Sequence, residues 1–178
     1  MQKQYLCKKR KEIMKKQHAQ LMQAMTEYDK GDVPRIQHFV KVHDFAVTIA
    51  QLEKVDEETQ FVLETAAILH DIGIHISEQK YGNCNGKHQE EEGPAEAVKV
   101  LQAVGGYTEA QIERVCFLIG HHHTYRDVEG IDWQILLEAD FLVNAYEDHV
   151  ATEGIKTFEE KVFKTQTGKH LLETMFDL

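Results

Sequence analysis

Cysteine and proline are scarce in this sequence. Its 178 residues include three cysteines, an odd number without the paired spacing of a metal-binding motif, and only two prolines. So few cysteines do not indicate a disulfide framework in a chain of this size. We therefore expect reduced thiols at Cys7, Cys84 and Cys116, and helices that few prolines interrupt.

Long hydrophobic runs are also missing. No uninterrupted apolar stretch approaches the roughly 20 residues that span a bilayer, and residues 1–16 lack the apolar region of a secretory signal. Neither a membrane-spanning nor a secreted protein is indicated by these patterns. We therefore predict that the protein has no membrane partner and is cytoplasmic.

Basic residues are outnumbered, and their distribution is uneven. The chain has 20 lysines and arginines against 30 acidic residues, yet residues 1–18 contain a single acid, Glu12, among several lysines and an arginine. The acidic remainder argues against general nucleic-acid binding. The basic segment could contact RNA, lipid headgroups or an acidic partner, although such a run is more often the solvated face of a terminal helix.

Helical patterns dominate the chain. The period-two alternation of β-strands, internal repeats and low-complexity tracts are all absent from the sequence, and its length suits one domain. We predict an all-α protein, a single compact bundle of seven or eight helices. The expected helices cover residues 3–29, 32–54, 56–71, 94–105, 108–120 and 132–148, with a weaker one from 157. We divide the chain into an N-terminal helix (1–30), a core (31–150) and a helical C-terminal tail (151–178).

Local signals mark where three of these helices begin. Asp32 and Asp56 are of the residue type that caps helix N-termini, and Pro34 suits a first helical turn. Thr108 and Gln111 have the spacing of a capping box. These residues predict helix starts close to positions 32, 56 and 108.

The segment after the third helix looks irregular. Gly73 stands where a chain leaving a helix often needs a positive φ, so we expect left-handed backbone there. Residues 74–93 contain three glycines and form the longest apparent loop. Because long loops in compact domains are often functional, we interpret this one as a lid or substrate loop.

Two polar residues lie on otherwise apolar helix faces. His38 begins a stripe whose alternating spacing of four and three residues faces a core: Val42, Phe45, Ile49 and Leu52. Asp140 is placed similarly in its helix. Burying an ionised carboxylate without a partner is costly, so Asp140 needs a cation or strong donors nearby. A metal ion would satisfy it.

The dipeptide His70-Asp71 closes the apolar run Ala-Ala-Ile-Leu at the end of a predicted core helix. Neighbouring helix positions point about 100° apart, yet both side chains can reach one ion beyond the last turn. The negative end of the helix dipole also favours a cation there. Imidazole nitrogen together with carboxylate oxygen suits Mn, Fe, Co, Ni or Zn, so we predict a metal site of open identity.

Three stretches follow the order His, His-Asp, Asp. They are RIQHFVKVHDFA with His38, AAILHDIG with His70 and Asp71, and LLEADFLVNAYED with Asp140. In this order the sequence resembles the HD superfamily of metal-dependent phosphohydrolases, over about two-thirds of the chain. The resemblance implies an HD-type metal-binding core in which these four residues hold a divalent ion, Mg included.

Relatives that use a second metal add histidines between the His-Asp pair and the last Asp. His88, His121 and His122 could supply such a metal or contact substrate, so the resemblance implies one or two metal ions per chain. His88 stands five residues before Gly93, where two-metal relatives tend to have four. His122, with His121 and His123 as neighbours, extends an apolar stripe if its helix continues past the preceding glycine. We assign surface or supporting roles to the remaining candidates His43, His75, His149 and His170.

The resemblance implies that a metal-activated water hydrolyses a phosphate ester. Asp71 or a nearby loop histidine would act as the general base, and Lys41 would donate to phosphate, although Lys41 could equally be solvated. Substrates among relatives include many nucleotides, so we expect a small phosphorylated substrate of that kind. Further phosphate-binding candidates lie in predicted loops: Lys80, Lys87 and Arg126.

Two other functions stay open. Some relatives of this scaffold hold two irons and cleave their substrates with dioxygen, and the additional histidines motivate that alternative. The chain could also be a non-catalytic, metal-stabilised module that binds a nucleotide or a partner through its basic first helix. The length of that helix would also suit a homodimer interface.

Overall fold

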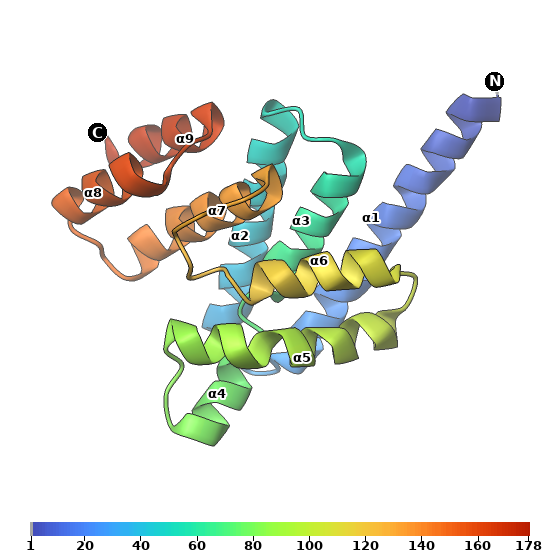
Figure 1. Cartoon of the computed structure of the whole chain (residues 1–178), viewed down its shortest axis with the longest axis horizontal. Coiled ribbons are helices and arrows are strands. Elements are labelled where there is room, and N and C mark those ends of the chain that lie inside the picture. The colour runs from blue at the N-terminus through green and yellow to red at the C-terminus, as the bar shows by residue number, and fades with distance from the viewer. Residues whose placement is uncertain (1) are drawn as a thin grey trace.

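The computed structural model describes the backbone of residues 2–178 and the side chains of residues 12–14 and 16–178. Over this part of the chain it contains nine α-helices and no strand, which confirms the all-α prediction (Figure 1). The helices are α1 (Gln2–Tyr28), α2 (Val33–Leu52), α3 (Glu57–Leu69), α4 (Ile74–Tyr81), α5 (Gly86–Val104), α6 (Glu109–Ile119), α7 (Ile131–Glu147), α8 (Thr152–Val162) and α9 (Gln166–Phe176). None of them is long and apolar enough to cross a membrane.

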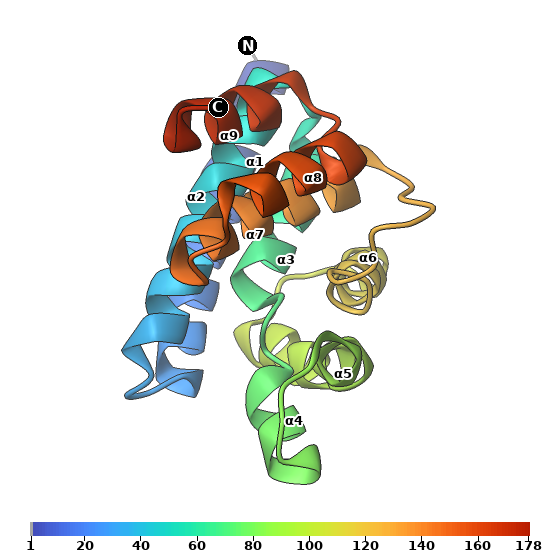
Figure 2. The ribbon, with the colours of Figure 1, turned by 90° about the vertical axis from the view of Figure 1, so that its left-hand side faces the viewer.

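Helices α2, α3 and α7 form the centre of the bundle. Helix α2 packs against both α3 and α7, and α3 also contacts α7. The pair α5 and α6 lies on one side, where α6 contacts α3, while α8 and α9 lie on the other side of α7 (Figure 2). The three central helices carry the three sequence motifs, so their packing positions the candidate site.

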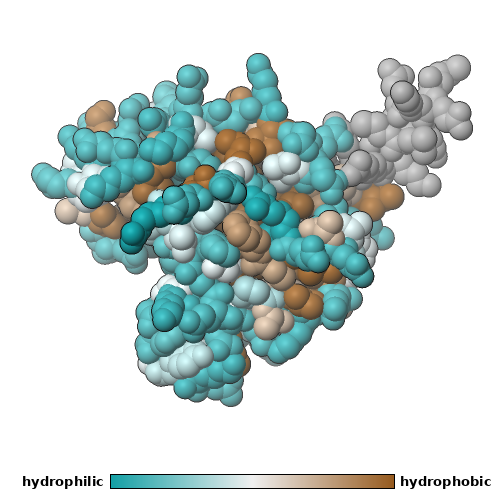
Figure 3. Space-filling model, viewed as in Figure 1, coloured by the Kyte–Doolittle hydropathy of each residue, from teal (hydrophilic) through white to brown (hydrophobic). Residues whose placement is uncertain are grey.

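The predicted core face of α2 is buried except at its last member, Leu52, which is 64% exposed at the end of the helix. Val42 and Ile49 are fully buried and Phe45 is half-buried, on the stripe that His38 begins. Helix α1 adds Leu21 and Met25 to the same core. Most of the basic segment 1–18 lies outside the described side chains, and Figure 3 draws that end of the molecule in grey.

The three predicted helix starts are confirmed. The Asp32 carboxylate accepts a hydrogen bond from the Arg35 amide, and Asp56 accepts from two amides of the first turn of α3. Thr108 and Gln111 form a reciprocal capping box at the start of α6. Side-chain oxygens thus satisfy amides that the helices leave unpaired.

The prediction of one long loop over residues 74–93 is wrong. Residues 74–81 form α4, and α5 begins at Gly86, so only residues 82–85 connect the two helices. Asn85 caps α5, because its side chain accepts a hydrogen bond from the His88 amide. This cap precedes Pro94 by more than two helical turns, which is why a helix start placed at the proline came too late.

Gly73 does not have the expected left-handed backbone. Its φ is -72°, a value that any residue adopts. A Cβ atom at this position would lie 2.7 Å from the Gln89 carbonyl oxygen and 2.9 Å from the Gly93 amide nitrogen. The glycine is therefore required by the close approach of the turn after α3 to helix α5.

The C-terminal tail is more ordered than the sequence indicated. Its first helix begins at Thr152 instead of Thr157, and a second helix follows. Glu138 of α7 is fully buried and accepts hydrogen bonds from the amides of Lys164, at 2.6 Å, and Thr165, at 3.0 Å. This buried carboxylate fastens the connection between α8 and α9 to the centre of the bundle.

Candidate metal centre

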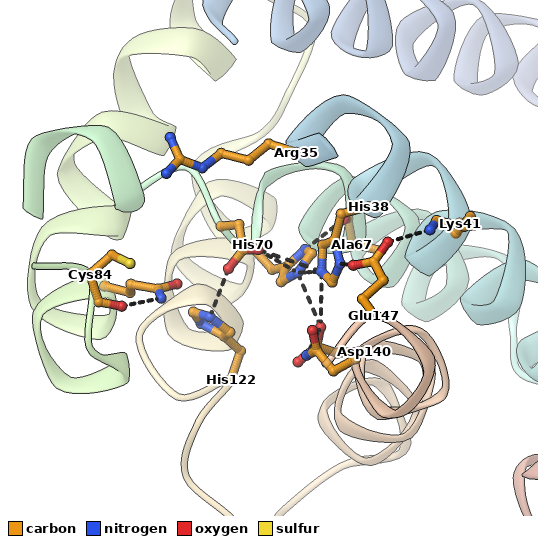
Figure 4. Close-up of polar contacts among 12 residues, drawn as sticks. Arg35, His38, Lys41, Ala67, His70, Cys84, His122, Asp140 and Glu147 are labelled. Carbon is orange, nitrogen blue, oxygen red and sulfur yellow. Dashed lines mark hydrogen bonds and ion pairs between the residues drawn. The ribbon is translucent and has the colours of Figure 1, made fainter. Parts of the chain in front are cut away.

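Four of the predicted metal ligands meet where α2, α3 and α7 come together. Figure 4 labels three of them, His38, His70 and Asp140. His38 Nε2 lies 3.1 Å from His70 Nε2 and 3.2 Å from Asp140 Oδ1. Asp71 Oδ2 lies 3.4 Å from His70 Nε2 and 3.5 Å from His38 Nε2. We refer to His38, His70, Asp71 and Asp140 as the central cluster.

The central cluster is buried except at Asp71. The side chain of His70 has no exposed surface, and those of His38 and Asp140 are almost fully buried. One quarter of the Asp71 side chain remains exposed (25%). Asp71 is therefore the point at which solvent or a small molecule reaches the central cluster.

The distances within the central cluster suit a single metal ion. Ligand atoms about 2.1 Å from a divalent ion lie about 3.0 to 3.4 Å apart in octahedral or tetrahedral geometry. Ligand atoms of His38, His70 and Asp71 all lie within 4.8 Å of one another, with facing pairs 3.1–3.5 Å apart. Asp140 is not part of that mutually close group, but its Oδ1 lies 3.2 Å from His38 Nε2 and 3.4 Å from His70 Nε2. Two imidazole nitrogens and two carboxylates are also donors that first-row divalent metals accept. The residues present therefore fit such an ion.

Outer hydrogen bonds direct the Nε2 atoms of both histidines into the central cluster. His38 Nδ1 donates to Glu147 Oε2 at 2.7 Å, and His70 Nδ1 donates to the Ala67 carbonyl oxygen at 2.9 Å. Metal-binding histidines generally use their second nitrogen in this way, which fixes the tautomer. Nε2 of each ring is thus the nitrogen that a metal ion would bind, and at His38 the ion would replace the proton that Nε2 shares with Asp140.

Opposite charges within the central cluster stabilise one another. Burial lowers the pKa of His38, but its hydrogen bond with Asp140 and the charge of Asp71 outweigh this and raise the pKa to about 9. Burial raises the pKa of Asp140, whereas its contacts with His38 and His70 lower the pKa more strongly. The pKa of Asp71 is also lowered, because nearby histidines outweigh the effect of its burial. Both carboxylates are therefore ionised at neutral pH, as metal ligands must be.

The turn after α6 brings two more histidines to Asp71. His122 is buried, its Nδ1 donates to the Ile119 carbonyl oxygen at 2.7 Å, and its Nε2 faces Asp71 Oδ1 at 3.5 Å. That Nε2 atom makes no hydrogen bond within the described part of the chain. Asp71, His122 and His123 offer ligand atoms within 4.8 Å of one another. Asp71 thus connects the central cluster to a second group able to hold an ion.

The HD domain family matches residues 35–160 of this chain, well over half of its length. The protein belongs to the HD domain family. Its fold is similar to that of a solved structure described as a predicted HD superfamily hydrolase from an uncultured Thermotogales bacterium. The two chains are 26% identical, the similarity covers 88% of this chain and 83% of that chain, and the TM-score is 0.61. No curated protein matches the chain.

An HD domain implies a bound metal ion, and His/Asp groups able to hold one are present. Of the three histidines considered for a second metal or substrate, only His122 reaches the central cluster through Asp71. His121 stacks on Phe117, with 4.2 Å between ring centres, and His88 stacks on Tyr81 at 3.9 Å. Helix α6 ends before the three histidines, so a turn, and not a continued helical stripe, directs His122 inward.

The predicted phosphate-binding residues lie around this HD domain in different settings. Arg126 is exposed between α6 and α7. The lysines form ion pairs: Lys41 with Glu147, Lys80 with Glu92 and Lys87 with Glu91. Lys41 differs from the other two lysines, because its partner Glu147 also accepts the hydrogen bond from His38.

Sequence reasoning missed two residues that support the central cluster. Asn144 Nδ2 donates to Asp140 Oδ1 at 2.9 Å, and Glu147 accepts from His38. They follow Asp140 by four and seven residues, the spacing of one helix face. That spacing was the available signal, and it lies within the stretch LLEADFLVNAYED.

Proposed function

We propose that this HD-domain protein is a metal-dependent phosphohydrolase that acts on a small phosphate ester, foremost a nucleotide. The observation that carries the proposal is the central cluster, with its facing ligand atoms 3.1–3.5 Å apart. The similar solved structure is itself described as a predicted HD superfamily hydrolase, which supports the same class of reaction.

The four residues of the central cluster would hold the metal ion and leave one side of it open to substrate. A divalent ion held there would bind a phosphate oxygen and lower the pKa of a coordinated water. His38, His70 and Asp140 are buried and exclude solvent from one side. Asp71 is partly exposed, so we place the approach of the substrate phosphate on its side.

We assign proton transfer to His123 and keep Asp71 as a ligand. Asp71 Oδ2 already faces His70 Nε2 at 3.4 Å and His38 Nε2 at 3.5 Å, which is where an ion would lie, so this carboxylate serves as a ligand. Burial and the charge of the neighbouring His122 lower the pKa of His123 to about 4. His123 is therefore neutral at pH 7, and its buried Nε2 makes no hydrogen bond within the described residues.

A groove of about 440 Å³ beside Lys41 supports a nucleotide as the substrate. Phe45 and Tyr146 are among the side chains that line it, and its surface is mainly apolar. Lys41 connects the groove to the central cluster through Glu147. An aromatic, apolar groove of this size suits a nucleobase.

Phosphate release tests this proposal. The protein is stripped of metal, reloaded with Mn²⁺, Co²⁺, Ni²⁺ or Mg²⁺, and assayed on a panel of nucleotides and sugar phosphates. We expect metal-dependent release that falls by about 100-fold or more in Asp71→Asn, because this change removes the charge of a ligand. Glu160→Gln is the control, since Glu160 is an exposed carboxylate in α8 that lines neither the central cluster nor the groove. Absence of release with every metal and substrate would contradict the proposal.

The position of Asp71 between two groups of histidines favours one alternative. A second ion at Asp71, His122 and His123 would make the site binuclear, which also suits a di-iron oxygenase. That activity would be favoured over hydrolysis if the protein bound two equivalents of iron and consumed oxygen when a phosphonate or polyol was added. Tight nucleotide binding without phosphate release or oxygen uptake would instead indicate a non-catalytic binding module.

A further inference from the structure

Three more side chains gather between α1, α2 and α3. His18, His43 and Glu64 offer ligand atoms that all lie within 4.8 Å of one another, and we refer to them as the α1 cluster. His43 follows His38 by five residues and Glu64 precedes His70 by six, which corresponds to about 8 Å along each helix. The α1 cluster is therefore separate from the central cluster and shares no residue with it.

The α1 cluster has the spacing and donor types of a metal site. Glu64 Oε2 lies 2.8 Å from His18 Nδ1 and 3.7 Å from His43 Nε2, on either side of the about 3.0 to 3.4 Å expected around one ion. The three side chains are between 11% and 20% exposed, so they are largely buried but remain within reach of a hydrated ion. Two histidines and one glutamate are a ligand set used for zinc, with a water in the fourth position.

The hydrogen bonds of His18 leave one of its nitrogens with a lone pair. The Thr65 hydroxyl donates to the Phe61 carbonyl oxygen at 2.8 Å, so its single proton is already used. His18 Nε2, 3.1 Å from Thr65 Oγ1, must therefore be the donor in that contact. Nδ1 of a neutral His18 then directs a lone pair at the Glu64 carboxylate, 2.8 Å away. The two atoms repel each other unless a proton or a metal ion lies between them.

Glu64 and His43 are also oriented so that each can bind a metal ion. Gln60 Nε2 donates to Glu64 Oε1 at 2.6 Å, which orients the carboxylate and leaves Oε2 to face the histidines. His43 Nε2 is buried and makes no hydrogen bond within the described residues. Burial raises the pKa of Glu64, but its interactions with His18 and His43 outweigh this and lower the pKa to about 2. The carboxylate is thus ionised at neutral pH.

We propose that His18, His43 and Glu64 form an additional site for Zn²⁺, or for a divalent ion of similar chemistry, that fastens α1 to the HD domain. His18 lies outside the matched residues 35–160, whereas His43 and Glu64 lie inside them. The α1 cluster therefore connects a helix that the family match does not include to the two helices that carry His38 and His70.

Zinc stoichiometry after equilibrium dialysis tests the proposal. The proteins compared are the wild type, Glu64→Gln, His43→Gln and the control His170→Gln, which changes an exposed histidine. Glu64→Gln keeps the size of the side chain and removes its charge. We expect both cluster variants to bind one equivalent of zinc less than the wild type and the control. If Glu64→Gln does not fold, the zinc content of His43→Gln tests the proposal. His43 Nε2 makes no hydrogen bond within the described residues, so the substitution removes none at that atom.

A second measurement separates the α1 cluster from the central cluster. In Asp71→Asn, which lacks the charge of a central ligand, zinc is expected to raise the urea midpoint of unfolding. In the double variant Asp71→Asn/Glu64→Gln this increase should be lost. The proposal would be overturned if the wild type and the cluster variants bound the same amount of zinc. It would also be overturned if zinc raised the urea midpoint equally in Asp71→Asn and in the double variant. Either result would mean that a proton, and not a metal ion, lies between His18 and Glu64.

Discussion

At the residue scale, Glu147 determines which nitrogen of His38 faces the central cluster. An ionised carboxylate only accepts hydrogen bonds, so His38 Nδ1 must carry the proton that lies between it and Glu147 Oε2. Burial raises the pKa of Glu147, but its contacts with Lys41 and His38 outweigh this and lower the pKa. The ion pair with Lys41 therefore helps to keep Glu147 charged and His38 in the tautomer that a metal requires.

Replacing Glu147 by glutamine should weaken metal binding without removing a ligand. A glutamine amide is a weaker acceptor, and it can also turn its NH₂ group toward His38 Nδ1 and favour the wrong tautomer. We expect the Kd for Mn²⁺, measured by titration calorimetry, to rise by about 10- to 100-fold. Glu160→Gln is the control, since Glu160 is exposed in α8. An unchanged Kd would mean that Glu147 does not orient His38.

At the element scale, the turn after α3 depends on close backbone packing. His70 and Asp71 lead directly into this turn, and Gly73 lies against the backbone of α5 at Gln89 and Gly93. The contact fixes where Asp71 leaves α3 relative to α5. The spacing between α3 and α5 thus affects the geometry of the central cluster.

Gly73→Ala should therefore destabilise the protein and also impair metal binding. The added Cβ meets backbone atoms, which cannot rotate away, so α3 and α5 must separate. We expect a loss of about 1 to 3 kcal/mol in the free energy of unfolding, measured by urea titration. Gly154→Ala is the control in α8, where the residue is exposed and its Cβ would meet only the Val150 side chain, at 3.0 Å, and no backbone, so its effect should be small. A stable Gly73→Ala protein with normal Mn²⁺ affinity would refute the importance of this contact.

At the scale of the whole molecule, α1 is part of the hydrophobic core although it precedes the matched HD domain. Leu21 and Met25 are almost completely buried and belong to the same core as α2, α3 and α7. Full burial of each such side chain contributes about 1.5 to 3 kcal/mol. Together the two side chains account for a large share of the about 5 to 15 kcal/mol by which a folded protein is stable.

Removal of residues 1–30 is accordingly expected to destabilise the HD domain. The lost burial of Leu21 and Met25 alone predicts a decrease of about 3 to 6 kcal/mol in the free energy of unfolding, visible as a lower urea midpoint. Leu21→Ala should reproduce about 2 to 5 kcal/mol of this. The exposed Gln20→Ala on the same helix is the control and should change little. A truncated chain with the wild-type midpoint would show that α1 is a dispensable extension.

Much of the fold could be predicted from the sequence because its signals are local. The caps at Asp32, Asp56 and Thr108 act on amides two to three residues away, so their helix starts can be found without a structure. Asn85 is a cap of the same kind, but Pro94 and three glycines obscured it. The backbone of Gly73 was predicted incorrectly because its constraint comes from a different helix.

The sequence by itself determined the all-α class, the family and the four residues of the central cluster, since helical periodicity is local and the order of the three motifs can be read along the chain. Only the tertiary structure decided which histidine faces Asp71, since that depends on the turn after α6. It also decided that Glu147 supports His38 across 109 residues and that His18 meets Glu64. Contacts between helices that are distant in the chain depend on how the helices pack, and no local pattern of residues records that packing.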